Sequence, residues 1–204
     1  MMIDGFMERL GTVISHGTQH LDVESSTDYI DDYTNSVTLP CVEFMPMNLY
    51  TSKKLVYLKL TSSGLRDPGF VYMPCLKFMH LEEVKWRVHL EKVLSGCPVL
   101  EELTLLKDHP TFFITQAPKK QGHCKVAHSE EMNEGLELTD VPRCVSTTLE
   151  CVEIKDKFEW EEGKMKVASY FLENSVVLKK LILSPTAYNQ NIYEKVNKLA
   201  KRSP

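Results

Sequence analysis

The sequence lacks an excess of basic residues and any long apolar run. It has 24 Lys and Arg against 28 Asp and Glu, for a net charge of −4. Non-specific nucleic-acid binding needs a broad basic surface, which this balance does not favour. The apolar runs are far shorter than the roughly 18 residues of a membrane-spanning helix, and the N-terminus lacks the basic-then-apolar layout of a secretory signal. We therefore expect no nucleic-acid partner and no membrane partner.

Paired cysteines are missing as well. None of the six cysteines forms a Cys-x-x-Cys pair, and the sequence has no Asn-x-Ser/Thr glycosylation site. A chain of 204 residues is long enough to bury a core without covalent cross-links, so scattered cysteines are typical of buried, reduced thiols. These residues therefore predict a cytoplasmic or nuclear protein. The cysteines are Cys41, Cys75, Cys97, Cys124, Cys144 and Cys151.

Motifs for catalysis are also absent. There is no His-Glu-x-x-His sequence and no glycine-rich phosphate loop, because the nine glycines do not cluster. His123, Cys124 and His128 form the best candidate for zinc, but a fourth ligand is missing unless the distant Cys144 joins them. Cys97 has no base near it in the sequence, so we interpret it as a small buried residue. The sequence therefore predicts a protein that is not an enzyme and holds no cofactor or metal.

What the sequence does contain is a repeated pattern, in which apolar residues stand at the first, fourth and sixth positions. The copies begin 21, 24, 49 and 29 residues apart, against about 20–29 residues for leucine-rich repeats. The interval of 49 would hold two periods, so we expect a degenerate repeat within it. The five copies are 55–60, 76–81, 100–105, 149–154 and 178–183.

The segments between the copies support this interpretation. Residues 90–96 predict a short helix with Leu90, Val93 and Leu94 on its apolar face. We expect Gly96 in the left-handed conformation just after this helix, and Pro98 cannot continue it. The chain would then return to begin the next strand. The predicted fold is α/β, a short leucine-rich-repeat solenoid with a curved sheet and helices on the convex side.

The strand positions between the apolar ones are the candidate binding surface. The three apolar positions of each copy would point into a core that only stacked neighbours can close, so the intervening residues would face outward on the concave side. The predicted partner-binding residues are Tyr57, Lys59, Phe78, His80, Glu102, Thr104, Glu153 and Lys180, and Cys151 and Ile182 occupy equivalent positions.

The flanking segments predict further elements. Apolar residues at steps of three and four predict a helix over 3–16, including Phe6, Val13 and Ile14, and a short strand over 20–23 follows. Together they would cap the stack. Helices are expected over 164–175, with Ala168, Phe171 and Leu172 inward, and over 189–201. Residues 107–143 would form a long loop with short strands at 112–114 and 137–138. We interpret the acidic residues at 28–32 as solvated surface, and Trp86 and Trp160 as packing residues.

Several strings of this sequence resemble a known family. They are "TSKKLVYLKLTSSGL", "MPCLKFMHLEEVKW" and "LEKVLSGCPVLEELTL", followed by "VPRCVSTTLECVEIKDKFEWEEGKMKVASYFLENSVVLKKLILS". The first three resemble plant F-box proteins with leucine-rich repeats, and the last resembles the FBD domain that closes many of them. The resemblance covers roughly residues 50–106 and 142–204, and more loosely 1–24.

The resemblance implies a substrate-recognition subunit of an SCF-type ubiquitin ligase, in which an F-box binds a Skp-type adaptor and the repeats hold a target protein. Residues 1–49 lack the leucine-proline opening and the tryptophan-containing helix of an F-box. A Skp-type adaptor is therefore expected only for a longer product that has an F-box. The alternative is a stand-alone scaffold or decoy with no ligase role. The expected divisions are 1–49 as a cap, 50–141 as leucine-rich repeats with an irregular loop, and 142–204 as an FBD-like domain.

Overall fold

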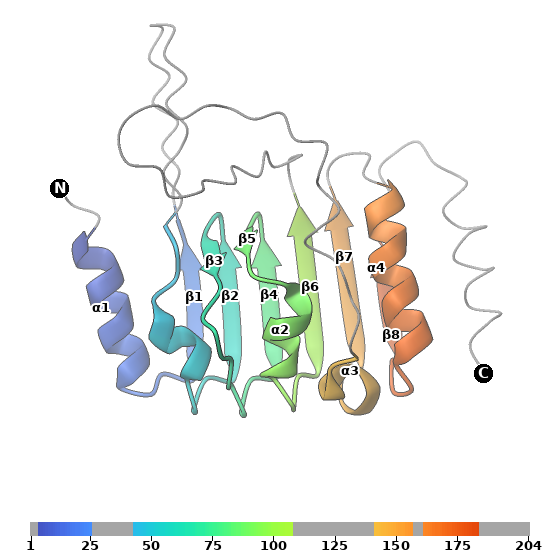
Figure 1. Cartoon of the computed structure of the whole chain (residues 1–204), viewed down its shortest axis with the longest axis horizontal. Helices are drawn as coiled ribbons and strands as arrows, with labels where there is room; N and C mark the ends of the chain where they lie inside the picture. The colour runs from blue at the N-terminus through green and yellow to red at the C-terminus, as the bar shows by residue number, and fades with distance from the viewer. Residues whose placement is uncertain (1–3, 26–42, 108–140, 157–160, 184–204) are drawn as a thin grey trace, which may run out of the picture.

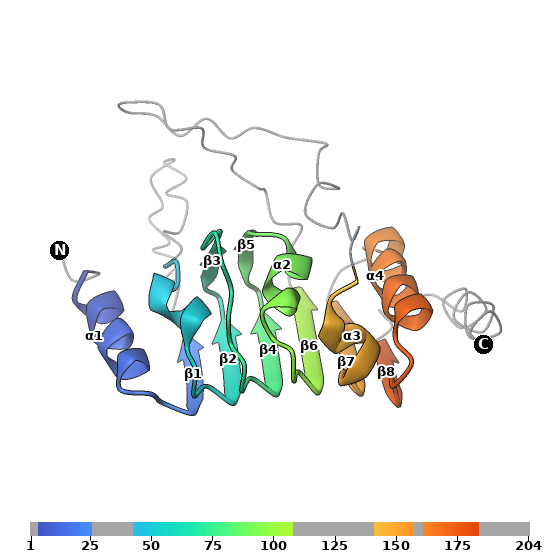
Figure 2. The ribbon, with the colours of Figure 1, turned by 60° about the horizontal axis from the view of Figure 1, so that its bottom comes forward.

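The chain folds around one six-stranded parallel β-sheet, as seen in a computed structural model (Figure 1). The structure describes residues 4–25, 43–107, 141–156 and 161–183. Figure 2 shows the six strands side by side in the order in which they occur along the chain. They are β1 (His20–Glu24), β2 (Tyr57–Thr61), β4 (Phe78–Glu82), β6 (Glu102–Lys107), β7 (Cys151–Asp156) and β8 (Lys180–Leu183). The predicted α/β class is confirmed, with a parallel sheet as its centre.

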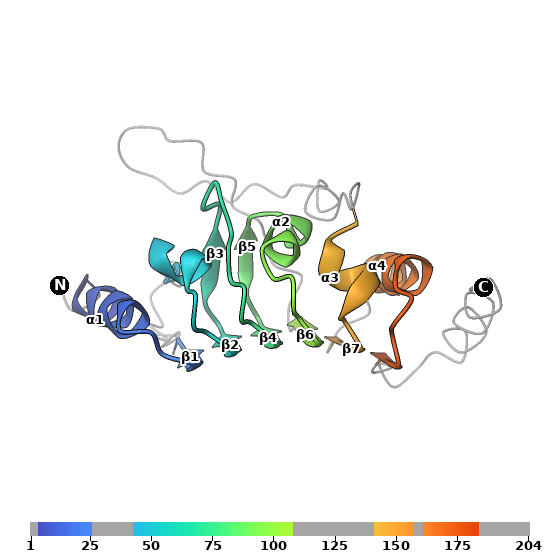
Figure 3. The same ribbon diagram turned by 90° about the horizontal axis from the view of Figure 1, so that it is seen from below.

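The helical elements all lie on one side of this sheet, as Figure 3 shows. A second, two-stranded parallel sheet joins β3 (Gly64–Arg66) to β5 (Lys85–Arg87). Neither this sheet nor the 3₁₀ helix was predicted from the sequence. The helical elements are α1 (Asp4–Ser15), the 3₁₀ helix η1 (Met47–Thr51), α2 (Leu90–Ser95), α3 (Arg143–Thr147) and α4 (Glu161–Asn174).

A regular hydrogen-bond pattern leads the chain into each new strand. Two successive amides, of Lys77 and Phe78, both donate to the carbonyl oxygen of Val56, at 2.9 and 3.1 Å. A carbonyl oxygen has two lone pairs, so the carbonyl of one residue can accept both amides at the start of the next strand. The same double acceptance recurs at every junction of the sheet. The accepting residues are Gln19, Val56, Lys77, Glu101 and Glu150.

The apolar positions of the pattern share one core, as predicted. Leu58, Met79 and Leu103 are register partners in adjacent strands, and each is at most 2% exposed. Burying a leucine side chain stabilises a fold by about 1.5–3 kcal/mol, so such a row contributes much of the stability. The first residue of the pattern lies in the bend before each strand and is fully buried in four of the copies. These residues are Leu55, Leu76, Leu100 and Leu149.

The turns that follow β2 and β4 are as similar to each other as the hydrogen bonds that begin these strands. Ser62 and Glu83 stand 21 residues apart, and both have a positive φ, of 52° and 53°. Non-glycine residues seldom adopt this conformation, so its recurrence marks one turn used twice. The turn leads into β3 after β2 and into β5 after β4. Gly64 begins β3, where the Phe44 ring lies 2.6 Å from the position of a Cβ.

The prediction for Gly96 is wrong in its physical reason. The helix α2 ends at Ser95, as expected, but Gly96 has φ −83° and ψ 0°, an ordinary right-handed conformation. A Cβ at this position would lie 2.3 Å from Cγ1 of Val71 and 2.6 Å from its backbone carbon. Glycine is therefore needed because the preceding segment passes directly over it, and the Gly96 carbonyl accepts the Met73 amide at 2.7 Å.

The prediction that a degenerate repeat lies between the third and fourth copies is also wrong, because no such repeat adds a strand to this sheet. Strand β6 pairs directly with β7, with Leu103 opposite Val152 and Leu105 opposite Ile154. No strand can therefore stand between them in this sheet. A parallel pair tolerates a long connection because the strands need a crossover in any case. The interval of 49 residues indicates a longer connection and no additional stacked strand.

The two predicted flanking helices that fall within the described residues, α1 and α4, lie where they were predicted, but not all of their predicted faces point inward. In α1, Leu10 and Ile14 are buried, but Val13 is 49% and Phe6 is 43% exposed. This helix packs on η1 at one end of the sheet and has no neighbour on its other side within the described residues, so part of its apolar surface stays uncovered.

In α4, Ala168 and Phe171 are fully buried, and Leu172 is only half-buried. Val167 and Tyr170 are buried as well, although the sequence pattern did not predict them to point inward. Trp86 packs partly buried against the core, as predicted. The predictions for residues 28–32, 112–114, 137–138, 189–201 and Trp160 fall outside the described residues.

Candidate protein-interaction surface

The face of the six-stranded sheet turned away from the helices carries every predicted partner-binding residue. We call it the outer face and define it by three rows of register partners. The first row is His20, Tyr57, Phe78, Glu102, Cys151 and Lys180. The second is Asp22, Lys59, His80, Thr104, Glu153 and Ile182. The third is Glu24, Thr61, Glu82, Leu106 and Lys155.

The central residues of this face were predicted correctly from the sequence, but those at its margins were not. Strand β1 was interpreted as a cap, so His20, Asp22 and Glu24 were not assigned to the surface, although β1 pairs with β2 in the same register as the other strands. The third row was missed because the repeated pattern ends at its sixth residue. The signal for both was the alternation of the strand, which puts every second residue on one face.

Aromatic rings cover the outer face over β1, β2 and β4. The rings of His20 and Tyr57 stack with centroids 5.9 Å apart and an interplanar angle of 23°. The ring of Tyr57 also lies 5.4 Å from that of His80, on the diagonal of the next strand. Phe78 is the register partner of Tyr57 and completes the group. We call these four residues the aromatic platform.

Among the described residues, two ion pairs lie on the outer face, one between β1 and β2 and one within β7. Nζ of Lys59 lies 3.5 Å from a carboxylate oxygen of Asp22, and Nζ of Lys155 lies 3.1 Å from one of Glu153. Exposed pairs of this kind contribute about 0–1 kcal/mol, so they shape the charge pattern more than the stability. Among the described residues, no ion pair is formed by Glu24, Glu82, Glu102 or Lys180.

The half-buried ring of His80 titrates below the ordinary range of histidine. Burial of the ring is the main cause of its lowered pKa, and the cations of Lys59 and Lys155 add to it, while Glu102 and Glu153 oppose them. Because the unperturbed pKa of histidine is already near 6.5, this ring is neutral at pH 7.

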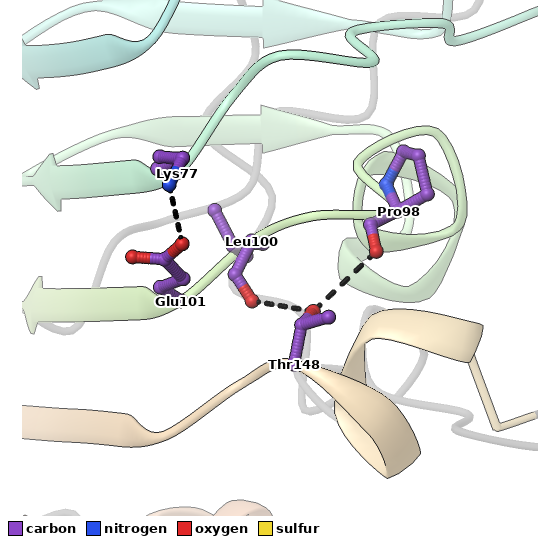
Figure 4. Close-up of polar contacts among 5 residues, drawn as sticks. All are labelled: Lys77, Pro98, Leu100, Glu101 and Thr148. Carbon is purple, nitrogen blue, oxygen red and sulfur yellow. Dashed lines mark hydrogen bonds and ion pairs between the residues drawn. The ribbon is translucent and has the colours of Figure 1, made fainter.

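The bends before the strands form a second polar line, alongside the outer face. Nζ of Lys77 lies 2.7 Å from Oε1 of Glu101, and Nζ of Lys179 lies 2.8 Å from Oε2 of Glu150 (Figure 4 shows the first pair). Oγ1 of Thr148 donates to the carbonyl of Leu100 at 2.8 Å, with the Pro98 carbonyl at 3.4 Å (Figure 4). These contacts tie the segment before β7 to the one before β6.

The buried thiols are unsuited to act as nucleophiles. Cys97 is fully buried and donates to the Val93 carbonyl, and burial raises the pKa of its thiol far above the ordinary range. Burial likewise raises the pKa of Cys144 to about 11, and its thiol donates to the Leu94 carbonyl. Cys151 is half-buried, but Cys75 is exposed, so the prediction of burial is wrong there.

Metal-ligating side chains do not gather in groups of three or more within the described residues. His123, Cys124 and His128 lie outside those residues, so the sequence-based view of them stays a prediction. Of the helices in the described ranges, none has the length and apolar character needed to cross a bilayer.

Comparison with known proteins assigns the chain to a family. Residues 137–183 match the FBD family, a range that contains α3, β7, α4 and β8. An F-box/FBD/LRR-repeat protein of Arabidopsis thaliana is 33% identical over 350 aligned positions, which take in 98% of this chain and 76% of that relative. An FBD-associated F-box protein of the same plant is 30% identical over 98% of this chain and 78% of its own length.

A further Arabidopsis F-box/FBD/LRR-repeat protein is 41% identical over 47% of this chain and 21% of its own length. No solved structure is similar enough to match. Because 98% of 204 residues is about 200, about 150 of the 350 positions aligned with the first relative have no residue in this chain. Because its relatives share about a third of their residues with it and align over nearly its whole length, the chain belongs to the plant family of F-box/FBD/LRR-repeat proteins.

Proposed function

We propose that this chain is a short leucine-rich-repeat solenoid that recognises a target protein, as the substrate-recognition part of an SCF-type ubiquitin ligase component. The observation that carries the proposal is the continuous register of the outer face across all six strands. Stacked units that each expose the same positions present a preformed surface, which repeat proteins use to bind partners. In this role the chain performs no chemistry, and it acts in the cytoplasm or nucleus.

The family supports the ligase context, because the relatives are named F-box proteins with leucine-rich repeats and an FBD domain. A stack in which each strand pairs with the one before can differ in length between relatives and remain paired throughout. The direct pairing of β6 with β7 agrees with such a difference, since this chain fills only about 200 of 350 aligned positions.

Site-specific cross-linking tests the recognition role. A photo-reactive amino acid would replace Lys59 or Thr104 on the outer face in the chain expressed in plant cells. Matched controls would carry it at Ser95 and Glu173, which are exposed on α2 and α4 on the other side of the sheet. We expect a cross-linked target from the first two positions and none from the controls. Equal cross-linking from all four would contradict recognition through the outer face.

A second candidate function is a scaffold or decoy that occupies a target without marking it. It is favoured by the N-terminal segment, because residues 4–25 supply α1 and β1 of the stack itself. These residues are therefore not free to form a separate adaptor-binding unit. Co-purification with a Skp-type adaptor separates the two candidates. Stoichiometric adaptor supports the ligase role, and its absence alongside a cross-linked target supports the decoy.

A further inference from the structure

The outer face divides into two parts of opposite charge. Over β1, β2, β4 and β6, its three rows contain four carboxylates and one ammonium group, a net charge of −3 with neutral histidines. Over β7 and β8 they contain one carboxylate and two ammonium groups, a net charge of +1. The acidic residues of the first part are Asp22, Glu24, Glu82 and Glu102, and its basic residue is Lys59.

The aromatic platform lies within the negative part. Glu102 stands opposite Phe78 in the register, and Glu82 follows two residues after His80 on the same strand face. Both carboxylates lack an ion-pair partner within the described residues. An aromatic face attracts cations through its quadrupole, and a carboxylate beside it adds a charge-assisted hydrogen bond. The two features occur together only in this part of the outer face.

We propose that the aromatic platform, with Glu82 and Glu102 at its border, binds a short basic segment of the target protein. An arginine or lysine side chain lies across Tyr57 and Phe78, and its charged end reaches one of the two carboxylates. The inference rests on the proposed recognition role and specifies the chemistry that the surface reads. Electrostatic complementarity of this kind speeds the encounter and rejects acidic partners.

The size of the surface favours a short segment over a globular partner. Six parallel strands span roughly 25 Å across, and the five residues of each strand span roughly 13 Å along. The resulting patch is less than half of the roughly 800 Å² that each partner buries in a standard protein complex. A peptide segment fits within it, and the neutral ring of His80 adds contact area there without repelling a cation.

Labelled peptides provide the direct test. The probes are fluorescein-labelled Gly-Ser-Arg-Gly-Arg-Ser-Gly and two matched peptides, one with citrulline and one with glutamate in place of both arginines. Citrulline keeps the planar shape of arginine and removes its charge. We expect the arginine peptide to bind at least about tenfold more tightly than either control in fluorescence anisotropy. We also expect this preference to shrink as the salt concentration rises.

Variants assign the binding to the platform. Tyr57→Leu removes the ring and keeps an apolar side chain, and Glu102→Gln removes the charge and keeps the size of the side chain; each should weaken arginine-peptide binding about threefold to tenfold. The matched control Glu173→Gln removes an exposed carboxylate on α4, on the other side of the sheet, and should leave binding within twofold. Unchanged thermal unfolding of each variant shows that the fold is intact.

Three outcomes would overturn the inference. One is equal binding of the arginine and citrulline peptides, which would assign the platform to an uncharged segment. Another is no peptide binding at millimolar concentration. The third is self-association of the chain in analytical ultracentrifugation that Tyr57→Leu abolishes, which would assign the platform to a second copy. If the cross-links from Lys59 and Thr104 persist in any of these cases, target recognition stands and only the basic segment is wrong.

Discussion

The strands up to β6 and the two strands after it join the same sheet in the same way, but their return segments differ. Between β2 and β6 the chain returns through the short strands β3 and β5 and, before β6, the six-residue helix α2. Before β8 it returns through the 14-residue helix α4, which buries Ala168 and Phe171. The entrance hydrogen bonds and inward apolar rows are alike in both regions. The edge of the sheet therefore fixes the backbone hydrogen bonds at the start of each new strand. The segment that packs over the strand is free to differ between the two regions.

The largest expected effect comes from removing the aromatic anchor of the C-terminal region. Phe171→Ala deletes a fully buried ring, and we expect it to lower the free energy of unfolding by about 3–5 kcal/mol. If the two regions share one core, hydrogen exchange will speed up in β4 as well as in β7. Val176→Ala is the matched control, because Val176 is 89% exposed and should cost almost nothing. Faster exchange confined to β7 and β8 would mean that the regions unfold separately.

A smaller effect is expected where the return segments of the N-terminal region cross. Gly96→Ala puts a methyl group against Val71, and we expect a loss of about 1–3 kcal/mol in urea unfolding. Gly5→Ala serves as control, because no atom lies within 4 Å of a Cβ in this helical position. A neutral Gly96→Ala would show that the two segments are not in close contact.

The junction between the regions depends in part on one hydroxyl group. Thr148→Val removes the hydrogen bonds to the Leu100 and Pro98 carbonyls, and we expect a loss of about 1 kcal/mol. Within the part of the chain that the structure describes, the neighbouring Thr147 bonds only to the Arg143 carbonyl of its own helix, so Thr147→Val should cost about half as much or less. Equal losses in thermal unfolding would show that Thr148 does not join the two regions.

The smallest effect is a pH dependence of the stability, which involves His80 in the N-terminal region and charged residues of β7 in the C-terminal region. The pKa of His80 is lowered in the folded state by burial first and by Lys59 and Lys155 next, against Glu102 and Glu153. The unfolded chain therefore takes up a proton at a higher pH, and stability decreases as the pH falls below about 6.5. His80→Gln should flatten this part of the stability curve. An unchanged curve would mean that the ring titrates as it does in water.

The sequence predicted the sheet well because its signal is local. The first, fourth and sixth positions of each copy fix which residues point inward, and Leu58, Met79 and Leu103 meet as expected. The outward residues followed from strand alternation alone. The aromatic platform could not be predicted fully, because its stacking of His20 on Tyr57 depends on β1 pairing with β2 across an interval of more than 30 residues.

The wrong predictions for Gly96 and for the degenerate repeat have the same cause. Both depend on contacts between segments that are distant in the sequence. The sequence could not show that Val71 lies over Gly96, so the glycine was explained by its own conformation. Nor could spacing alone show that a 49-residue interval adds no strand, since the pairing of β6 with β7 is set by register. A repeated pattern predicts which residues of each strand point inward. It does not predict how many strands lie between two copies of the pattern.

The central claim is that β6 and β7 are neighbours in one sheet and so extend one outer face into the FBD-matched segment. It is tested most directly by nuclear Overhauser contacts between methyl groups of Leu103 and Val152 in a methyl-labelled chain. The two residues are register partners, both almost fully buried, so the account predicts a strong cross-peak. The absence of that peak, with Val152 in contact with residues of another strand, would contradict the account.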